Sequence, residues 1–398
     1  MRDYPEEELA SLVALAWLPG MGPATLLRCL HEVGPSTAWR AASSGRLGDV
    51  EALASFAARQ RDPTWVQTMV DAARSIDPAA YLDRHRSAAI TIVVHGQRGY
   101  PDRLLNDEAA PALLFVDGTL DPLDGPVVAI VGTRNATRLG CDTAAALAQD
   151  LASCGVAIAS GLALGIDGAA HRAIVGESDK FKSGDESGRP VAVVATGLDR
   201  AYPRRHALLQ RQVASRGAVV SESPFGIGPL RWRFPARNRI LAALADAVVV
   251  VESRSAGGSM LTVAEALRRD VQVLAVPGHP TSPAAAGTLD LICDGAIPVR
   301  DAEDVLVALG LGGKRPVVTE SRAESGDRLA PLHAFILDAL AAGPLTLAQL
   351  VEATGRALPE VSTALISLET AGHVTRSGSW FEPRASAPRG RARGRSAP

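Results

Sequence analysis

The stretch VVAIVGTRNATRLG, residues 127–140, decides the fold class. Five consecutive apolar residues lead to a turn at Gly132, and the Ala- and Leu-rich segment DTAAALAQDLASCG (142–155) follows with helical spacing. A continuous apolar strand before an amphipathic helix is typical of a parallel sheet with helices on both faces. Such sheets bind ligands at the carboxyl ends of their strands. Candidate functional residues are therefore expected directly after the strands.

The same alternation of strand and helix extends from about Ala89 to Gly310. Further strands are expected in ITIVVHG, VAIAS, VAVVAT, AVVSE, AVVVVES, VQVLAVPG and AIPV, and most of the segments between them are rich in Ala and Leu, as in MLTVAEALRRD. The pattern predicts an α/β domain built on a Rossmann-like, doubly wound parallel sheet.

Two smaller helical regions flank this domain. LPGMGPATLLRCL (18–30) places glycines between two apolar helical stretches, as in a helix-hairpin-helix motif, although a plain helical hairpin fits equally well because few basic residues lie nearby. LHAFILDAL and the residues after it predict three helices and a short hairpin, the winged-helix arrangement. The expected parts are a helical helix-hairpin-helix/SAM-like domain (1–80), the Rossmann-like domain (85–310), a linker (311–330), a winged-helix domain (331–384) and a disordered Arg-rich tail (385–398).

Composition narrows the possible classes of function. The formal net charge of the 398 residues is -2, so a phosphate-binding surface must be a local patch rather than a basic body. The four cysteines lack the spacing of a zinc site or a disulfide framework, and we expect reduced thiols, no metal and no cofactor. The N-terminus is acidic and no apolar run approaches the ~20 residues that span a bilayer. We expect a cytoplasmic protein without a membrane partner.

Three glycine-rich turns follow expected strands and precede expected helices. In each, a glycine lets the backbone turn closely, and free N–H groups at the helix N-terminus attract anions. None has the GxGxxG spacing of a dinucleotide site. Each such turn is an anion nest, a set of neighbouring backbone N–H groups that can bind one anion. Several nests along one sheet edge suit a polyanion better than a single mononucleotide. The turns contain Gly132-Thr133-Arg134, Ser160-Gly161 and Gly257-Gly258-Ser259.

Other polar residues near these turns have ordinary structural interpretations. Asp167 has the position of a helix cap, and His171 is expected to pack or to form a hydrogen bond rather than to act as a base. Three carboxylates, Glu222, Glu252 and Glu265, are scattered along the sequence. The sequence has no Ser/His/Asp order, metal-ligand cluster or carboxylate pair that points to catalysis.

The stretch RWRFPARNR (231–239) supplies the local basic patch, since it contains four arginines, two aromatic residues and no acid. Pro235 fits the first position of a helix, which would place Arg237 and Arg239 in its first turn. A positive charge at a helix N-terminus interacts unfavourably with the helix dipole, which costs roughly 0.3–1 kcal/mol of stability for each residue. This unfavourable arrangement makes sense if an anion docks at this end of the helix. Trp232 or Phe234 could stack on a base, worth on the order of 1–3 kcal/mol. A solvated basic turn with both aromatic rings in the core is the alternative.

In their order and spacing these motifs resemble the DprA/Smf family of DNA-processing proteins of bacterial natural transformation. The match runs from about Gly99 to Val299 through VAIVGTRNATRLG, SGLALGIDGAAH, ATGLDRAYPRRH, SESPFG, FPARNRILAALADAVVVVES, GGSMLT and VPGHP. The resemblance implies an extended Rossmann fold and sequence-independent binding of single-stranded DNA without catalysis. It also implies a homodimer that loads RecA recombinase onto the strand during natural transformation in competent cells.

The resemblance further implies which residues contact DNA. Leu164 lies where the family often has a basic or polar residue, so no contact is expected there, and GESDKFKSGDESGRP (176–190) is longer than usual. The implied contacts are Gly132, Thr133, Arg134, Ser160, Gly161, Phe234, Arg237, Asn238, Arg239, Gly257, Gly258 and Ser259.

Two questions stay open at this point. The LOG-type nucleotide phosphoribohydrolases share a Rossmann-like core, and the turn at 257–262 with Glu265 is loosely similar to theirs, so a LOG-like nucleotide phosphoribohydrolase is the alternative function. The candidate recognition helix of the winged-helix domain, residues 359–371, contains neither Lys nor Arg. We therefore expect that domain to contact protein or to regulate dimerisation rather than to read duplex DNA.

Overall fold

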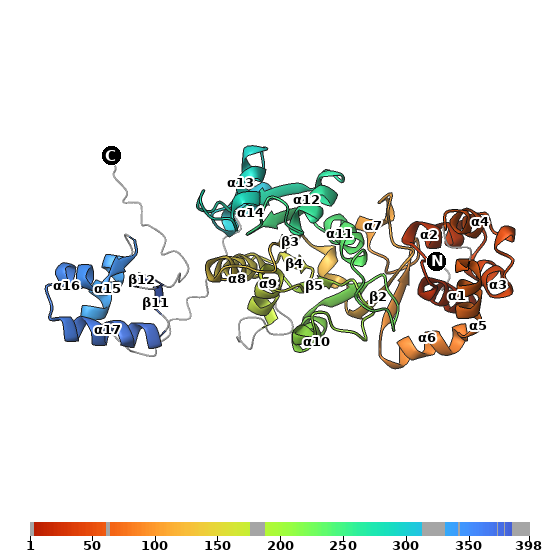
Figure 1. The fold of residues 1–398 in the computed structure, drawn as a ribbon, viewed down its shortest axis with the longest axis horizontal. Coiled ribbons are helices and arrows are strands. Elements are labelled where there is room, and N and C mark those ends of the chain that lie inside the picture. Colours follow the sequence, from red (N-terminus) through yellow and green to blue (C-terminus); the bar gives the residue numbers. More distant parts are fainter. Residues whose placement is uncertain are drawn as a thin grey trace. The chain divides into compact units, whose positions relative to one another are not determined.

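The computed structural model describes residues 4–60, 64–175, 188–312, 331–340, 343–371, 373–377 and 379–383 (Figure 1). The chain divides into two compact units, Met1–Val317 and Val318–Pro398. Most of the expected long loop at 176–190, most of the expected linker and the Arg-rich tail lie outside the described residues.

Helices open the first unit, and the first two form the expected helical hairpin. Gly20 takes a positive φ of 74° in the turn between them, a conformation that glycine adopts without steric cost. Pro23 then occupies the first turn of the second helix, where its missing N–H group would have no partner anyway. The six helices are α1 (Glu6–Trp17), α2 (Pro23–Glu32), α3 (Pro35–Ser44), α4 (Glu51–Ala58), α5 (Trp65–Arg74) and α6 (Pro78–Ser87).

A sheet of nine strands forms the centre of this unit, in the order β1-β2-β6-β5-β4-β3-β7-β8-β9. All pairings from β6 to β9 are parallel, as the apolar runs predicted. The strands are β1 (Thr91–Val94), β2 (Leu113–Gly118), β3 (Val127–Val131), β4 (Ala157–Ser160), β5 (Pro190–Val193), β6 (Ala218–Ser221), β7 (Ala247–Val250), β8 (Gln272–Ala275) and β9 (Ile297–Pro298).

The sheet is mostly but not entirely parallel, since at one side β2 pairs antiparallel with both β1 and β6. The segment ALLFVDG (112–118) was not among the expected strands. A parallel crossover requires a dozen or more residues and usually a full helix. The connection from β1 to β2 contains only the one-turn helix α7 (Asp102–Leu105), so the chain reverses direction there.

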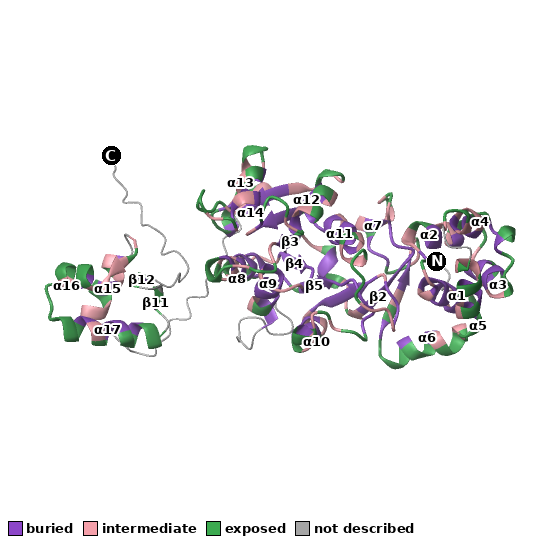
Figure 2. Cartoon of the chain, viewed as in Figure 1, coloured by how far each residue is buried: buried purple, intermediate pink, exposed green. Residues whose placement is uncertain are grey.

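Alternate residues of the strands face two separate cores, which explains the continuous apolar runs. In β3, Val128 and Ile130 face one core, whereas Val127, Ala129 and Val131 face the other. Figure 2 shows the buried residues concentrated in the strands and on the inner sides of the helices. The first core contains α8 (Arg138–Ser153), α9 (Ile166–Val175) and α14 (Ala302–Ala308), and the second contains α11 (Arg233–Leu244), α12 (Ser259–Leu267) and α13 (Ala286–Cys293). Helix α10 (Ala207–Arg216) packs near β5 and β6.

The N-terminal helices share a third core with the sheet, and His85 of α6 lies at the centre of the contact. Its ring stacks on Phe115 of β2 and on Phe225, at centroid distances of 4.9 Å and 4.3 Å. Nδ1 donates to the carbonyl oxygen of Tyr81 (2.9 Å), while Nε2 accepts from the backbone N–H of Phe225 (3.0 Å). Because Nε2 must accept, this arrangement requires the neutral imidazole.

The second unit is a winged-helix domain, as the sequence predicted. Its described elements are α15 (Pro331–Leu340), β10 (Leu345–Thr346), α16 (Leu347–Thr354), α17 (Leu358–Thr370), β11 (Val374–Ser377) and β12 (Trp380–Pro383), and the strand order is β10-β12-β11. Ile336, Leu350, Leu365 and Phe381 are buried at its centre. A capping box between Thr346 and Gln349 begins α16.

Candidate nucleic-acid interface

The sheet topology brings the strand-end loops to one edge. From β3 the chain winds outward through β4, β5 and β6, and then returns so that β7 pairs with β3 on its other side. The loops after β3 and β7 therefore diverge at a topological switch point, where open α/β sheets bind ligands. A hydrogen bond from the N–H of Thr133 to the carbonyl oxygen of Glu252 (2.7 Å) joins the two loops.

Close packing requires glycine at position 132, directly after β3. Arg134, two residues later, is exposed to solvent. A Cβ atom on Gly132 would lie 2.5 Å from Cγ1 of Ile166 and 2.8 Å from the carbonyl oxygen of Glu252. Thr133 is half-buried, whereas Arg134 is exposed. The guanidinium of Arg134 lies over the ring of Phe234, 5.3 Å from its centroid. The structure thus brings together two of the residues that the sequence selected.

A carboxylate of the chain itself occupies the N-terminus of α8, contrary to the expectation of an open anion site there. Glu252 accepts from the backbone N–H (2.9 Å) and the hydroxyl (2.5 Å) of Thr137. The Thr137 hydroxyl oxygen in turn accepts from the N–H of Gly140 (3.0 Å), where a side chain would collide with Glu252. Negative charge is favourable at a helix N-terminus, and Glu252 supplies it internally.

The turn after β4 is a second anion nest that the chain fills by itself. Leu162 has a positive φ of 54°, which directs the N–H groups of Gly161 and Ala163 toward Oδ2 of Asp167 at 3.1 Å and 3.4 Å. Nδ1 of His206 donates to the carbonyl oxygen of Leu162 (3.0 Å). The expectation that Asp167 caps a helix is wrong, because it lies inside the first turn of α9 and holds the preceding loop.

Arg237 lies beneath this turn and is almost fully buried, with 5% of its surface exposed. Its Nη1 donates to the carbonyl oxygens of Gly161 (2.9 Å) and Val193, and its Nε donates to Oδ1 of Asn238 (3.2 Å). Burial lowers the pKa of Arg237 to about 10, so the guanidinium stays charged at neutral pH, where it attracts the carboxylate of Asp167. Arg237 thereby ties the ends of β4 and β5 together.

Arg239 is also engaged internally, in an ion pair with the largely buried Glu222. Burial raises the pKa of Glu222, and the charge of Arg239 opposes that rise. The prediction that Pro235 begins a helix is wrong, since α11 begins at Arg233 and Pro235 is its third residue. Proline is tolerated there because the first N–H groups of a helix have no intrahelical partner. Arg237 and Arg239 consequently lie in the second turn.

Ser160 and Ser259, which the sequence also selected, have buried hydroxyl groups. Ser160 donates to the carbonyl oxygen of Ile130 (2.6 Å), and Ser259 donates to Oγ of Ser253 (2.8 Å). Gly257 is half-buried and its N–H group donates to the carbonyl oxygen of Arg254 (2.8 Å). Gly258 is exposed, with open space where a side chain would begin.

The exposed edge contains aromatic and basic residues beyond the contacts that the resemblance implied. Tyr202 is 43% exposed and its ring lies 5.2 Å from that of Phe234. Trp232 is 49% exposed, so the alternative with both aromatic rings in the core is wrong. Arg254 is exposed in the loop after β7, and Arg204 and Arg205 are exposed in the segment between β5 and α10. Their places in segments that follow two expected strands were the signal that could have identified them.

Glu265, the carboxylate on which the LOG-like alternative depends, is paired with two arginines. Glu265 accepts from Nη1 of Arg269 (2.6 Å) and of Arg268 (3.0 Å), and Arg269 also pairs with Asp107 (2.5 Å). His171 is fully buried, and burial lowers its pKa to about 4. Across the described ranges, no group of three His, Cys, Asp or Glu side chains is placed to hold a metal ion. No helix in the described part of the chain is both long and apolar enough to cross a membrane.

Comparisons with known proteins agree with this architecture. The family model for DNA recombination-mediator protein A matches residues 91–310, and the model for the DprA winged-helix domain matches residues 320–378. Protein Smf of Synechocystis sp. is 31% identical over 397 residues, covering 91% of this chain and 95% of the relative. Protein Smf of Escherichia coli is 37% identical over 279 residues, covering 69% and 72%.

A solved structure agrees as well. The X-ray structure of DNA processing protein A from Streptococcus pneumoniae is similar at a TM-score of 0.59 with 30% identity, covering 77% of this chain and 98% of the other. The first family model spans more than half of the chain and contains every strand-end loop described above. The chain therefore belongs to the DprA/Smf family of DNA-processing, recombination-mediator proteins.

Proposed function

We propose that this protein binds single-stranded DNA without sequence preference along the carboxyl edge of its sheet and catalyses no reaction on it. The observation that carries the proposal is the pairing of Arg134 with Phe234 on that edge, next to Tyr202. The exposed guanidinium offers a phosphate contact, and the half-buried ring offers a face for a base. Stacking requires an unpaired base, which favours a single strand over a duplex.

The proposal divides the expected contact residues by their burial. Direct contact is assigned to Arg134 and Phe234, to the backbone of Gly132, to the side chain of Thr133, and to the turn at Gly257 and Gly258, of which Gly258 is exposed. A positioning role is assigned to the residues whose polar groups are engaged inside the protein, namely Ser160, Gly161, Arg237, Asn238, Arg239 and Ser259. Because the two nests after β3 and β4 contain internal carboxylates, the phosphates are expected to meet side-chain cations rather than those helix ends.

Binding of a labelled poly-dT oligonucleotide over a series of salt concentrations tests this function. Arg134→Ala is expected to weaken binding to all sequences alike. The slope of the logarithm of the binding constant against the logarithm of the salt concentration should become smaller by about 0.7, because one phosphate contact is lost. Arg211→Ala removes an exposed arginine from α10 and serves as the matched control. If Arg134→Ala binds like the parent at every salt concentration, the assignment is wrong. Release of free base from AMP by the parent would instead favour the hydrolase alternative.

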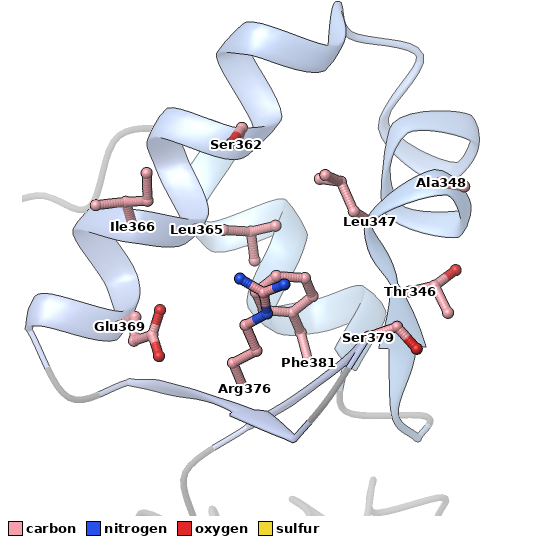
Figure 3. Close-up of a pocket in the computed structure, with 10 residues that line it drawn as sticks. All are labelled: Thr346, Leu347, Ala348, Ser362, Leu365, Ile366, Glu369, Arg376, Ser379 and Phe381. Carbon is pink, nitrogen blue, oxygen red and sulfur yellow. The ribbon is translucent and has the colours of Figure 1, made fainter.

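As a member of this family the protein is further proposed to act as a homodimer and to load RecA recombinase onto the bound strand. Support for a protein-contacting role comes from α17, which exposes Leu358 and Ile366 and carries acidic rather than basic residues. A pocket of about 370 Å³ lies between this helix, α16 and the hairpin, with Arg376 beside Phe381 (Figure 3). Sedimentation analysis tests the dimer. RecA ATPase activity on protein-coated single strands tests the loading.

A further inference from the structure

A groove of about 590 Å³ lies where the N-terminal helices meet the sheet domain. Trp17 and the Gly20–Gly22 turn line one side, and Leu230 and Trp232 line the other, together with Arg233. We call it the tryptophan groove. Its volume is in the range of pockets that bind small flat ligands. Both walls belong to the first compact unit of the chain, so the groove is part of one folded body.

The groove and the proposed DNA edge lie on the two sides of the N-terminus of α11. Residues two apart in a helix point to nearly opposite sides, because each residue turns the chain by about 100°. Phe234 accordingly faces Tyr202 and Arg134, while Trp232 faces the glycine turn between α1 and α2. The start of α11 therefore separates two aromatic surfaces, one on the sheet edge and one in the tryptophan groove.

Arg231 and Arg233 give the groove basic groups, and the one carboxylate that acts on Arg233, Glu222, is already paired with Arg239. The guanidinium of Arg233 lies 4.5 Å from the centroid of the Trp232 ring, and Nη1 donates to Oγ of Ser223 (2.8 Å). Its buried Nε has no hydrogen-bond partner among the residues described, and a buried donor of this kind is normally satisfied. Arg231 is exposed at the rim, and the first turn of α2 contains no acidic residue.

We propose that the tryptophan groove binds a second nucleobase of the same DNA strand, stacked on Trp232, so that the helical hairpin extends the binding edge. This inference rests on the proposed single-strand binding. An exposed tryptophan face beside an arginine provides the stacking and cation–π contacts that bind bases without regard to sequence. The glycine turn leaves room for the base, since nothing lies within 4 Å of a Cβ atom built on Gly22.

A length series of dT oligonucleotides tests the inference on the full-length protein. Trp232→Ala is expected to bind the shortest oligonucleotides like the parent and to bind longer ones roughly 5- to 150-fold more weakly, which is the effect of one lost stack. The salt dependence is expected to stay unchanged because no phosphate contact is removed. Trp232→Phe keeps a ring and should recover part of the loss. Leu208→Ala, which removes an apolar side chain 61% exposed on α10, is the matched control.

Photocrosslinking of the unaltered protein gives a readout that does not depend on how the variants fold. Oligonucleotides that carry 5-iododeoxyuridine at successive positions are expected to form adducts on Trp232 or Trp17 in addition to Phe234 or Tyr202. Adducts confined to the latter pair would overturn the inference, as would full binding of long oligonucleotides by Trp232→Ala. The proposed function would survive both results provided that Arg134→Ala still loses affinity. If Trp232→Ala loses only RecA stimulation, the groove contacts protein and the inference is wrong.

Discussion

Replacing Arg237 by alanine should reduce the stability of the fold far more than the removal of one surface contact would. The side chain is 5% exposed and donates to two backbone carbonyl oxygens at the ends of β4 and β5. Its charge also opposes the rise that burial causes in the pKa of Asp167. In Arg237→Ala the Asp167 carboxylate would stay buried without the cation that acts on it most strongly, and only the weaker attraction of Arg134 would remain.

The expected magnitude follows from that geometry. Removal of one partner from a buried pair of charges costs about 3–5 kcal/mol. Asp167 keeps the N–H groups of Gly161 and Ala163, which partly compensate its charge, so the lower end of the range, about 3 kcal/mol, is expected. Arg134→Ala is the matched comparison. Because Arg134 is exposed, its loss should change the free energy of unfolding by less than about 0.5 kcal/mol.

Urea unfolding followed by tryptophan fluorescence measures both variants against the parent. The difference in the free energy of unfolding between the parent and Arg237→Ala should shrink as the pH falls. The reason is that the folded variant would bind a proton at Asp167 more readily than the unfolded chain does. Asp167→Asn in the Arg237→Ala background should restore part of the stability. The reasoning would be refuted if Arg237→Ala unfolded with the free energy of the parent yet bound DNA weakly, because Arg237 would then act on the DNA rather than on the fold.

Two further predictions concern the buried histidines and Glu252. Burial lowers the pKa of His85 from 6.5 and that of His171 to about 4. The unfolded chain therefore binds more protons below pH 6.5, and the free energy of unfolding should fall as the pH drops from that value. A flat profile between about pH 7.5 and about pH 4.5 would contradict this expectation. Glu252→Gln removes the negative charge at the N-terminus of α8 and should cost about 1 kcal/mol of stability. A denaturant midpoint equal to that of the parent would show that Glu252 does not stabilise this helix end.

Local sequence patterns predicted most of the architecture. Apolar runs separated by amphipathic segments predicted the strands from β3 to β9, and the spacing after residue 331 predicted the winged helix. The same patterns did not identify β2. Its antiparallel direction could not be predicted locally either, because it depends on a pairing with β6, about a hundred residues later in the chain. Pro235 misled the prediction of the start of α11, since proline is accepted at several positions of a first helical turn.

The sequence by itself determined the type of sheet, the edge where its loops gather and the residue types in those loops, because strand period and glycine turns are local properties. Only the tertiary structure decided which of those residues meet solvent. Glu252 reaches Thr137, 115 residues away, and Arg237 reaches Gly161, 76 residues away. Such distant partners satisfy some of the charged groups by hydrogen bonds inside the protein, whereas Arg134 and Trp232 stay exposed and Phe234 stays half-buried.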